Sequence, residues 1–214
     1  MEGLKMTFDY KKEYKEYYLP PQKPTIVDVP KMNFIAVYGK GNPNDKDGDY
    51  QHAIESLYTI AYTIKMSKKT NYHINGYFDY VVPPLEGFWW QDEEKNNYTN
   101  KENFQWISII RLPDFVTEKD VNWAKKEAMH KKKKDFSNVQ FLTYNEGICV
   151  QCLHVGSYDD EPTTIQMMEE HIMHLGYQSN ITNHRFHHEI YLSDPRRVKP
   201  EKLKTIIRIP ICKY

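Results

Sequence analysis

The hydrophobic positions of the chain recur in the same order in its two halves. The segments 109–113 (Ile-Ile-Arg-Leu-Pro) and 206–210 (Ile-Ile-Arg-Ile-Pro) are nearly identical and have the β-branched character of buried strands. Upstream of them, the apolar stretches 33–38 and 148–155 are each followed by a glycine, which is typical of a strand that runs into a turn. The chain therefore contains an internal repeat that begins and ends with a strand.

Each half also carries a helix and a further strand between these two. Apolar residues at positions i, i+3, i+7 and i+10 form one stripe of a helix in both halves. The segments 78–84 and 189–195, which end in proline, predict a strand after each helix. The helical stripes are Ile54, Leu57, Ala61 and Ile64 in the first half, and Ile165, Met168, Ile172 and Leu175 in the second.

This order of elements predicts an α+β fold. Tandem pseudo-symmetric βαββ repeats would form one antiparallel sheet, with the helices on one face and an aromatic cleft on the other. The first repeat covers residues 33–113 and the second 147–211, within a single domain of residues 33–214. The pattern of 118–134 predicts a helix that connects the repeats, and residues 1–32 form an N-terminal arm that is rich in tyrosine.

Composition narrows the range of partners. The 29 Lys and Arg residues balance 29 Asp and Glu residues, so no general attraction to nucleic acid or to an anionic membrane is expected. No apolar run approaches the roughly 18 residues of a membrane-spanning helix, and no signal-peptide pattern opens the chain. We therefore expect a cytoplasmic protein with no nucleic-acid partner and no membrane partner.

Aromatic residues are abundant, with 17 Tyr, 9 Phe and 4 Trp. The alternation of one predicted strand indicates where some of them lie. If Ile190 and Leu192 face the helices, then His187, Glu189 and Tyr191 point to the opposite side of the sheet. A carboxylate among rings would have its pKa raised by desolvation, as a general base or a cation-binding site requires. The alternative for Glu189 is a surface salt bridge.

Further rings are expected around the same cleft. Aligning the two halves on their prolines places Phe78 opposite Glu189 and Tyr80 opposite Tyr191. Other candidates lie on neighbouring strands and at the helix starts. For any single ring, the alternative is that it fills the core. The candidate ligand-binding residues are Trp89, Trp90, Trp106, Phe78, Tyr80, Phe88, Tyr50, Tyr158 and His187.

Other kinds of site have little support in the sequence. His171 and His174 lie at i, i+3 on a predicted helix, and more histidines precede Glu189, but zinc motifs use a different spacing. A GxSxG elbow, a P-loop and a GxGxxG motif are all absent from the sequence. We therefore expect no metal and no cofactor.

Several stretches resemble a known family. Residues 153–158 (Leu-His-Val-Gly-Ser-Tyr) and 189–192 (Glu-Ile-Tyr-Leu) resemble the GyrI-like small-molecule-binding family, which includes effector domains of multidrug-sensing transcription activators. Residues 79–90 and 187–197 are similar to a stand-alone bacterial subfamily, and the likeness runs from about residue 25 to the C-terminus. The resemblance implies a deep aromatic cleft with an acid at its floor, and the acid of the family matches Glu189.

Some stand-alone members of this family are cyclopropanoid cyclopropyl hydrolases, which destroy DNA-alkylating compounds. The resemblance implies that rings hold a flat aromatic xenobiotic by stacking, while Glu189 orients or deprotonates the water that opens its strained ring. The hydroxyl of Tyr191 or Tyr80 would stabilise charge that moves onto a conjugated carbonyl. Two alternatives stay open. One is a non-catalytic protein that sequesters flat, often cationic compounds, and the other is a protein that binds a macromolecule such as gyrase.

Overall fold

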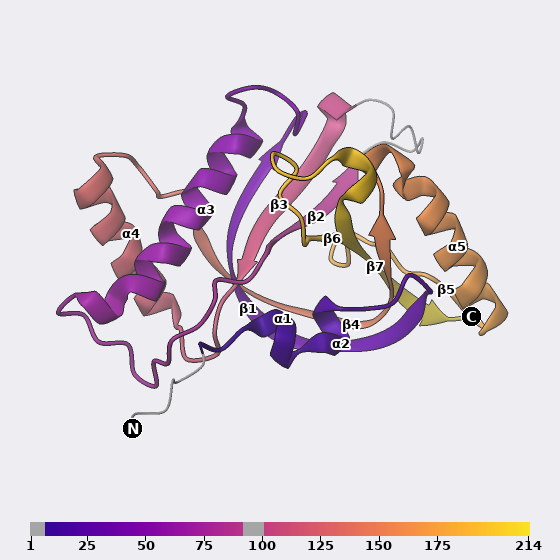
Figure 1. Ribbon diagram of the computed structural model, residues 1–214, viewed down its shortest axis with the longest axis horizontal. Coiled ribbons are helices and arrows are strands. Elements are labelled where there is room, and N and C mark those ends of the chain that lie inside the picture. Colours follow the sequence, from indigo (N-terminus) through magenta and orange to yellow (C-terminus); the bar gives the residue numbers. More distant parts are fainter. Residues whose placement is uncertain (1–6, 92–100) are drawn as a thin grey trace.

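The computed structural model describes residues 7–91 and 101–214, so the start of the predicted arm and residues 92–100 of the first repeat lie outside the described residues (Figure 1). Short 3₁₀ turns occur at Met66–Lys69, Lys101–Asn103, Tyr158–Asp160 and Pro200–Lys202. The helices are α1 (Tyr10–Glu13), α2 (Lys15–Tyr18), α3 (Asp49–Lys65), α4 (Glu118–Lys132) and α5 (Glu161–His174). The strands are β1 (Thr25–Lys40), β2 (Leu85–Gln91), β3 (Phe104–Arg111), β4 (Gln140–Val155), β5 (Tyr177–Ser179), β6 (His187–Tyr191) and β7 (Lys204–Lys213).

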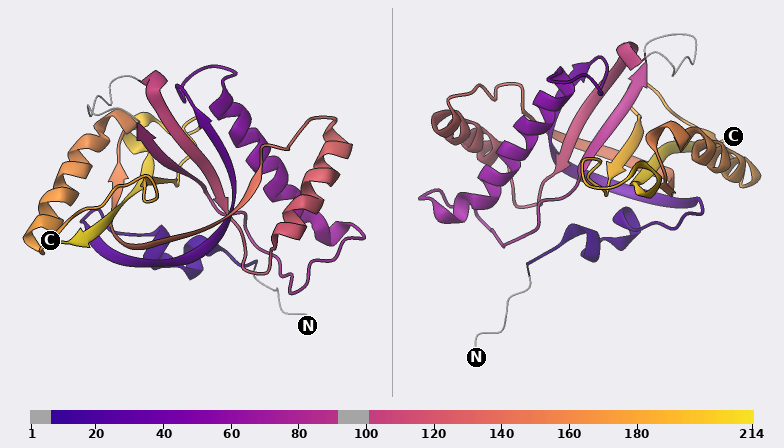
Figure 2. Two further views of the ribbon diagram at one scale, coloured as in Figure 1. Left: turned by 180° about the vertical axis from the view of Figure 1, so that it is seen from behind. Right: turned by 45° about the horizontal axis from the view of Figure 1, so that its top comes forward.

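The strands form an antiparallel barrel. In the described part of the chain they pair in the order β4, β1, β3, β2, β6, β7, and β4 also pairs with β7, which closes the ring (Figure 2). Closure depends on the length of β4, because residues 140–151 pair with β1 while residues 149–155 pair with β7. The predicted α+β class with an antiparallel sheet is confirmed, and the sheet curves until its edges meet.

The three longer helices pack on the outer face of this barrel (Figures 1 and 2). The predicted stripe of α3 is largely confirmed, since Leu57, Ala61 and Ile64 are buried in one core cluster with residues of β1, β3 and α4. Met168 and Ile172 of α5 are buried against β4 and β7, but Leu175, predicted as the last member of this stripe, follows the helix and is exposed. The two equivalent helices therefore cover different sides of one barrel. None of the described helices is both long and apolar enough to cross a membrane.

The strand predicted at residues 78–84 is wrong. These residues hold one isolated bridge, at Tyr80, and β2 begins after the two prolines that end the segment. Proline has no N–H group to donate to a strand ladder, so the regular pairing starts beyond it. In the structure, β2 pairs with β6, and Glu86 and Ile190 pair with the equivalent residues Ile109 and Ile206 of the repeated strands. Glu86 is therefore the counterpart of Ile190, and the alignment of the two halves on their prolines is out of register.

The N-terminal segment closes the inner side of the barrel. β1 begins at Thr25, inside the range predicted for the arm, and the short helices α1 and α2 precede it. Tyr10 and Tyr18 are buried there, and the hydroxyl of Tyr18 donates to Oε1 of Glu86 at 3.2 Å. The guanidinium of Arg111 lies 4.8 Å from the centre of the Tyr10 ring, as a cation–π contact requires. Tyrosines of the arm thus supply apolar cover and polar partners to the barrel interior.

Four buried charged side chains, Glu86, Glu146, His188 and Arg208, form one network inside the barrel. His188 Nδ1 lies 3.0 Å from Glu146 Oε1, and His188 Nε2 lies 3.0 Å from Glu86 Oε2. Arg208 Nη1 lies 3.0 Å from Glu146 Oε2. Burial alone would lower the pKa of His188, but the two carboxylates raise it above its ordinary value. With His188 protonated, two positive and two negative charges balance in this network.

Candidate functional site

Glu189 lies on the outer face of the barrel, beside the starts of α3 and α5. Its neighbours include Tyr50 at the start of α3 and Glu161, the first residue of α5, while Ile190 packs on the inner side with tyrosines of the arm. Strand alternation therefore grouped His187, Glu189 and Tyr191 correctly. The predicted face was wrong, because the aliphatic residues of β6 face the barrel interior and the acid faces the helices.

A chain of hydrogen bonds fixes the carboxylate of Glu189. Tyr191 donates its hydroxyl to Glu189 Oε2 at 2.8 Å, and Trp89 Nε1 donates to the hydroxyl of Tyr191 at 2.8 Å. His187 Nε2 lies 3.1 Å from Glu189 Oε1. Burial and the charge of Glu189 hold the pKa of Tyr191 well above its ordinary value, so the phenol keeps its proton and stays a donor. The side chains of His187 and Glu189 are 17 % and 14 % exposed, so solvent reaches both.

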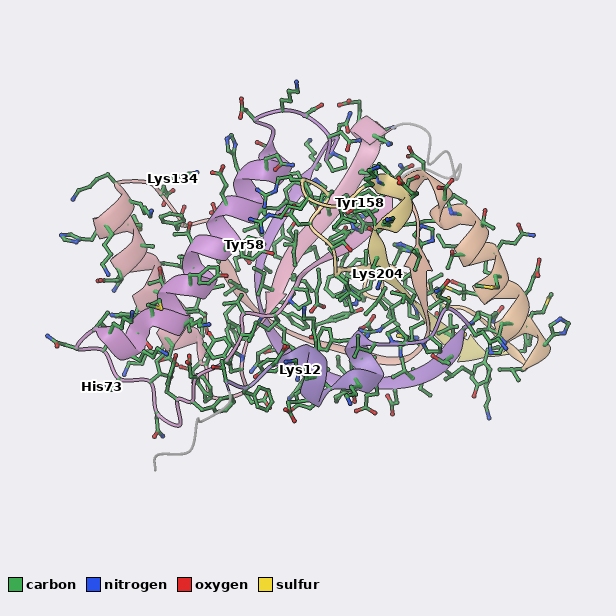
Figure 3. All side chains as sticks on the ribbon, viewed as in Figure 1. Lys12, Tyr58, His73, Lys134, Tyr158 and Lys204 are labelled. Carbon is green, nitrogen blue, oxygen red and sulfur yellow. The ribbon has the colours of Figure 1, made fainter. Side chains whose placement is uncertain are left out.

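Aromatic rings surround this chain. The Tyr50 ring centre lies 5.3 Å from that of Trp89 and 5.1 Å from that of Trp106. Tyr158, which is labelled in Figure 3, meets Tyr191 edge-on with ring centres 6.0 Å apart. Burial and the neighbouring carboxyls of Glu189 and Glu161 raise the pKa of Tyr158 to about 12, so it too stays protonated. The structure thus gathers seven of the predicted site residues: Tyr50, Trp89, Trp106, Tyr158, His187, Glu189 and Tyr191.

The other four candidates lie away from Glu189. Trp90 and Phe88 point into the barrel, where Trp90 packs 5.0 Å from Phe186 between ring centres. Adjacent residues of a strand face opposite sides, which explains why Trp89 joins the site and Trp90 does not. Phe78 packs against Phe8 and Phe115, and Tyr80 is buried in the cluster beneath the arm. The prediction that Phe78 and Tyr80 line the site with Glu189 is therefore wrong.

Glu161 is a member of the site that the sequence argument missed. It is 7 % exposed, and its Oε1 atom is buried with no hydrogen-bond partner among the described residues. Burial, the charge of Glu189 and that of Asp159 hold the pKa of Glu161 well above its ordinary value. A signal was present in the sequence, because an acid continues the apolar stripe of α5 at i, i+4, i+7 and i+11. That series is Glu161, Ile165, Met168 and Ile172.

Three side chains approach closely enough to raise the question of a metal ion. One oxygen each of Glu161 and Glu189 and one ring nitrogen of His187 lie within 4.8 Å of one another. However, Nε2 of His187 lies 3.1 Å from a carboxylate oxygen of Glu189, and in the tautomer that has its proton on Nε2 this nitrogen donates a hydrogen bond there and offers no lone pair to a metal. We therefore assign no metal to this group.

Two open hollows lie beside α4. One, of about 380 Å³, lies between α3 and α4 and is lined by residues such as Tyr58, which Figure 3 labels, and Trp123. The other, of about 560 Å³, lies between residues 69–72 and α4. Neither hollow includes a member of the Glu189 cluster, so the predicted deep cleft is not among them. Tyr158, which is 38 % exposed, is the least covered of the clustered residues.

Fold and site together define a class of protein: a ligand-binding barrel with two equivalent outer helices and an acidic, aromatic site at the starts of these helices. The model of the GyrI-like small molecule binding domain matches residues 22–211, and the chain belongs to this family. None of the curated proteins compared matches the sequence.

Comparison of the chain with solved structures supports its membership of this family. A hydrolase from Listeria innocua is 47% identical, with a TM-score of 0.88, over 96% of this chain and 100% of that one. A conserved protein from the same organism is 47% identical, with a TM-score of 0.91 and the same coverage. The C-terminal domain of EcmrR is 13% identical with a TM-score of 0.54, over 90% of this chain and 98% of that one, which shows a shared fold alone.

Proposed function

We propose that the protein hydrolyses flat, electrophilic aromatic compounds, with cyclopropane-bearing DNA-alkylating agents as the substrate class. The observation that carries the proposal is a carboxylate held among rings. Glu189 is fixed by Tyr191 and His187 and bordered by Trp89 and Tyr50. The 47% identity to a protein described as a hydrolase supports an enzymatic role for this arrangement.

In this proposal the rings bind and the acid activates water. Trp89 and Tyr158 stack on the flat substrate and hold its strained ring near Glu189. The carboxylate of Glu189 accepts a proton from a water molecule as that water attacks the strained carbon. Tyr191 has one hydroxyl proton, which it already donates to Glu189 at 2.8 Å, so its role is to position the base.

The experiment is incubation with a flat cyclopropane-bearing compound, followed by mass analysis. We expect a product heavier by one water molecule, and we expect Glu189→Gln to slow its formation by about 10²–10⁴-fold, as removal of a general base does. Trp89→Ala should weaken binding severely. Trp90→Ala is the matched control, because Trp90 lies on the same strand but packs into the barrel. Equal turnover by wild type and Glu189→Gln would refute the assignment.

A second function, sequestration without chemistry, is favoured by one observation. Among the described residues, neither Glu189 nor Glu161 is ion-paired with Lys or Arg. A carboxylate without a counter-ion and surrounded by rings suits a flat organic cation. Tryptophan fluorescence quenching by such compounds, with no change in their mass, would select sequestration over hydrolysis.

A further inference from the structure

A second carboxyl group lies at the site and has no part in the function proposed above. Glu161 begins α5, is 7 % exposed, and has a buried Oε1 atom that meets no donor among the described residues. An oxygen of its carboxyl lies within 4.8 Å of an oxygen of Glu189, between α5 and β6. Because a carboxylate can only accept hydrogen bonds and two of them repel, this proximity favours a proton or a cation held between them.

We propose that Glu161 holds the proton of a carboxyl pair with Glu189 and delivers it to the substrate as the acid of the reaction. The delivery step rests on the proposed function, whereas the existence of the pair does not. A pair of this kind titrates as a unit, with one proton held over the range in which the other carboxyl is charged. Glu189 is then the base and Glu161 the acid.

The groups that face Glu161 favour this assignment of the proton. Lys101, a nearby cation, pairs instead with Asp159 at 3.2 Å on the surface. The amino-terminal end of α5 attracts negative charge, but this effect is weaker than the repulsion between two neighbouring carboxylates of low exposure. Burial of Glu161 disfavours its charge as well. The titratable groups nearby are Glu189, His187 and Tyr191 of β6, Tyr50 of α3, and Tyr158 and Asp159 of the turn before α5.

The pair supplies both proton transfers that ring opening needs. Water attacks the strained carbon, a carbon–oxygen bond forms, and the carbon–carbon bond of the cyclopropane breaks. The electron pair of the broken bond moves into the conjugated carbonyl. Glu189 takes one proton from the water, and Glu161 gives its own proton to the carbonyl oxygen. The pair holds one proton before and after the reaction, and exchange with solvent returns it to Glu161.

The pair is tested without any substrate by infrared difference spectroscopy of the carboxyl groups across a pH titration. Wild type should keep one protonated carboxyl at pH 7, and Glu161→Gln should remove that signal. Glu169→Gln, on the exposed side of the same helix, is the control and should leave it unchanged. The pair is overturned if wild type has no protonated carboxyl at pH 7 or if the signal survives in Glu161→Gln. A metal bound at one per chain that is lost in Glu161→Gln would overturn it too.

Delivery of the proton is tested by the pH dependence of turnover. Glu161→Gln should lower turnover at pH 7 by about 10²-fold or more, as loss of a general acid does. Wild-type turnover should fall as pH rises and Glu161 loses its proton, and this alkaline decline should be absent from the variant. An unchanged alkaline decline would assign the decline to another group and overturn delivery by Glu161. If wild type converts no compound, delivery and the proposed function both fail, while the infrared result still decides the pair.

Discussion

Replacement of Glu146 by glutamine should strongly destabilise the barrel, because Glu146 compensates two buried cations. Its Oε1 atom lies 3.0 Å from His188 Nδ1, and its Oε2 atom lies 3.0 Å from Arg208 Nη1. Each of the three side chains is at most 4 % exposed. Glutamine has nearly the same size but no charge, so Arg208 would remain buried beside a neutral group. The variant therefore isolates the electrostatic role of one carboxylate.

The pKa of Glu146 gives the expected magnitude. Burial raises this pKa, but His188 and Arg208 lower it more, from 4.5 to about 2. A change of that size corresponds to about 3 kcal/mol of unfolding free energy. Removal of one partner from a buried ion pair costs about 3–5 kcal/mol, which agrees with this value. Because the folded-state pKa is the lower one, this stability is fully present above about pH 4.5 and is lost as the pH falls toward 2.

The assay is urea unfolding followed by tryptophan fluorescence, at pH 7 and at intervals down to about pH 3. Wild type should lose stability over the acidic range, whereas Glu146→Gln should start lower at pH 7 and change less with pH. Glu169→Gln, the same exchange on the surface of α5, should stay within about 0.5 kcal/mol of wild type. A loss below about 1 kcal/mol in Glu146→Gln, or a full wild-type acid response, would refute the electrostatic account.

Three further variants test packing and hydrogen bonding. Gly39→Ala should lower the unfolding free energy by about 1–3 kcal/mol in urea, because the new Cβ would overlap the ring of buried Trp106. Gly87→Ala would place a Cβ 3.2 Å from the hydroxyl of Tyr191, so fluorescence titration with a flat aromatic ligand should show a weakened site in a protein that still unfolds cooperatively. Tyr18→Phe should cost about 1–2 kcal/mol in urea, since it removes a 3.2 Å hydrogen bond to a buried carboxylate.

The spacing of apolar residues predicted two helices and the alternation of one strand. The stripes of α3 and α5 follow helical periodicity, and the alternation of β6 separated Glu189 from Ile190 correctly. Alternation cannot say which side of a strand the helices cover when both sides are buried. Ile190 finds apolar neighbours among tyrosines of the arm, so its side of the strand needs no helix. The sequence therefore predicted the grouping but not the face.

The residues of the candidate site were harder to predict, because they come together only when strands that are distant in the sequence pair in the barrel. Trp89 was recognisable as a ring on a strand, but its bond to Tyr191 depends on the pairing of β2 with β6. That pairing was obscured by the false strand at 78–84, which drew Phe78 toward the site. Glu161 looked like an ordinary acid in the first turn of a helix. Only its position on the apolar stripe indicated that it would be buried.

The two faces of β6 differ in how their charged side chains are compensated. On the inner face His188 lies between Glu86 and Glu146, and Glu146 also meets Arg208, with each of these contacts at 3.0 Å. One residue later, Glu189 faces Glu161 on the outer face with hydrogen bonds but no paired Lys or Arg among the described residues. A buried group that lacks a counter-charge costs stability, so a fold that needs the acid only for structure would pair it, as the inner face does. The carboxyls of the outer face, which have no Lys or Arg partner among the described residues, are therefore the ones to which we assign the proposed chemistry.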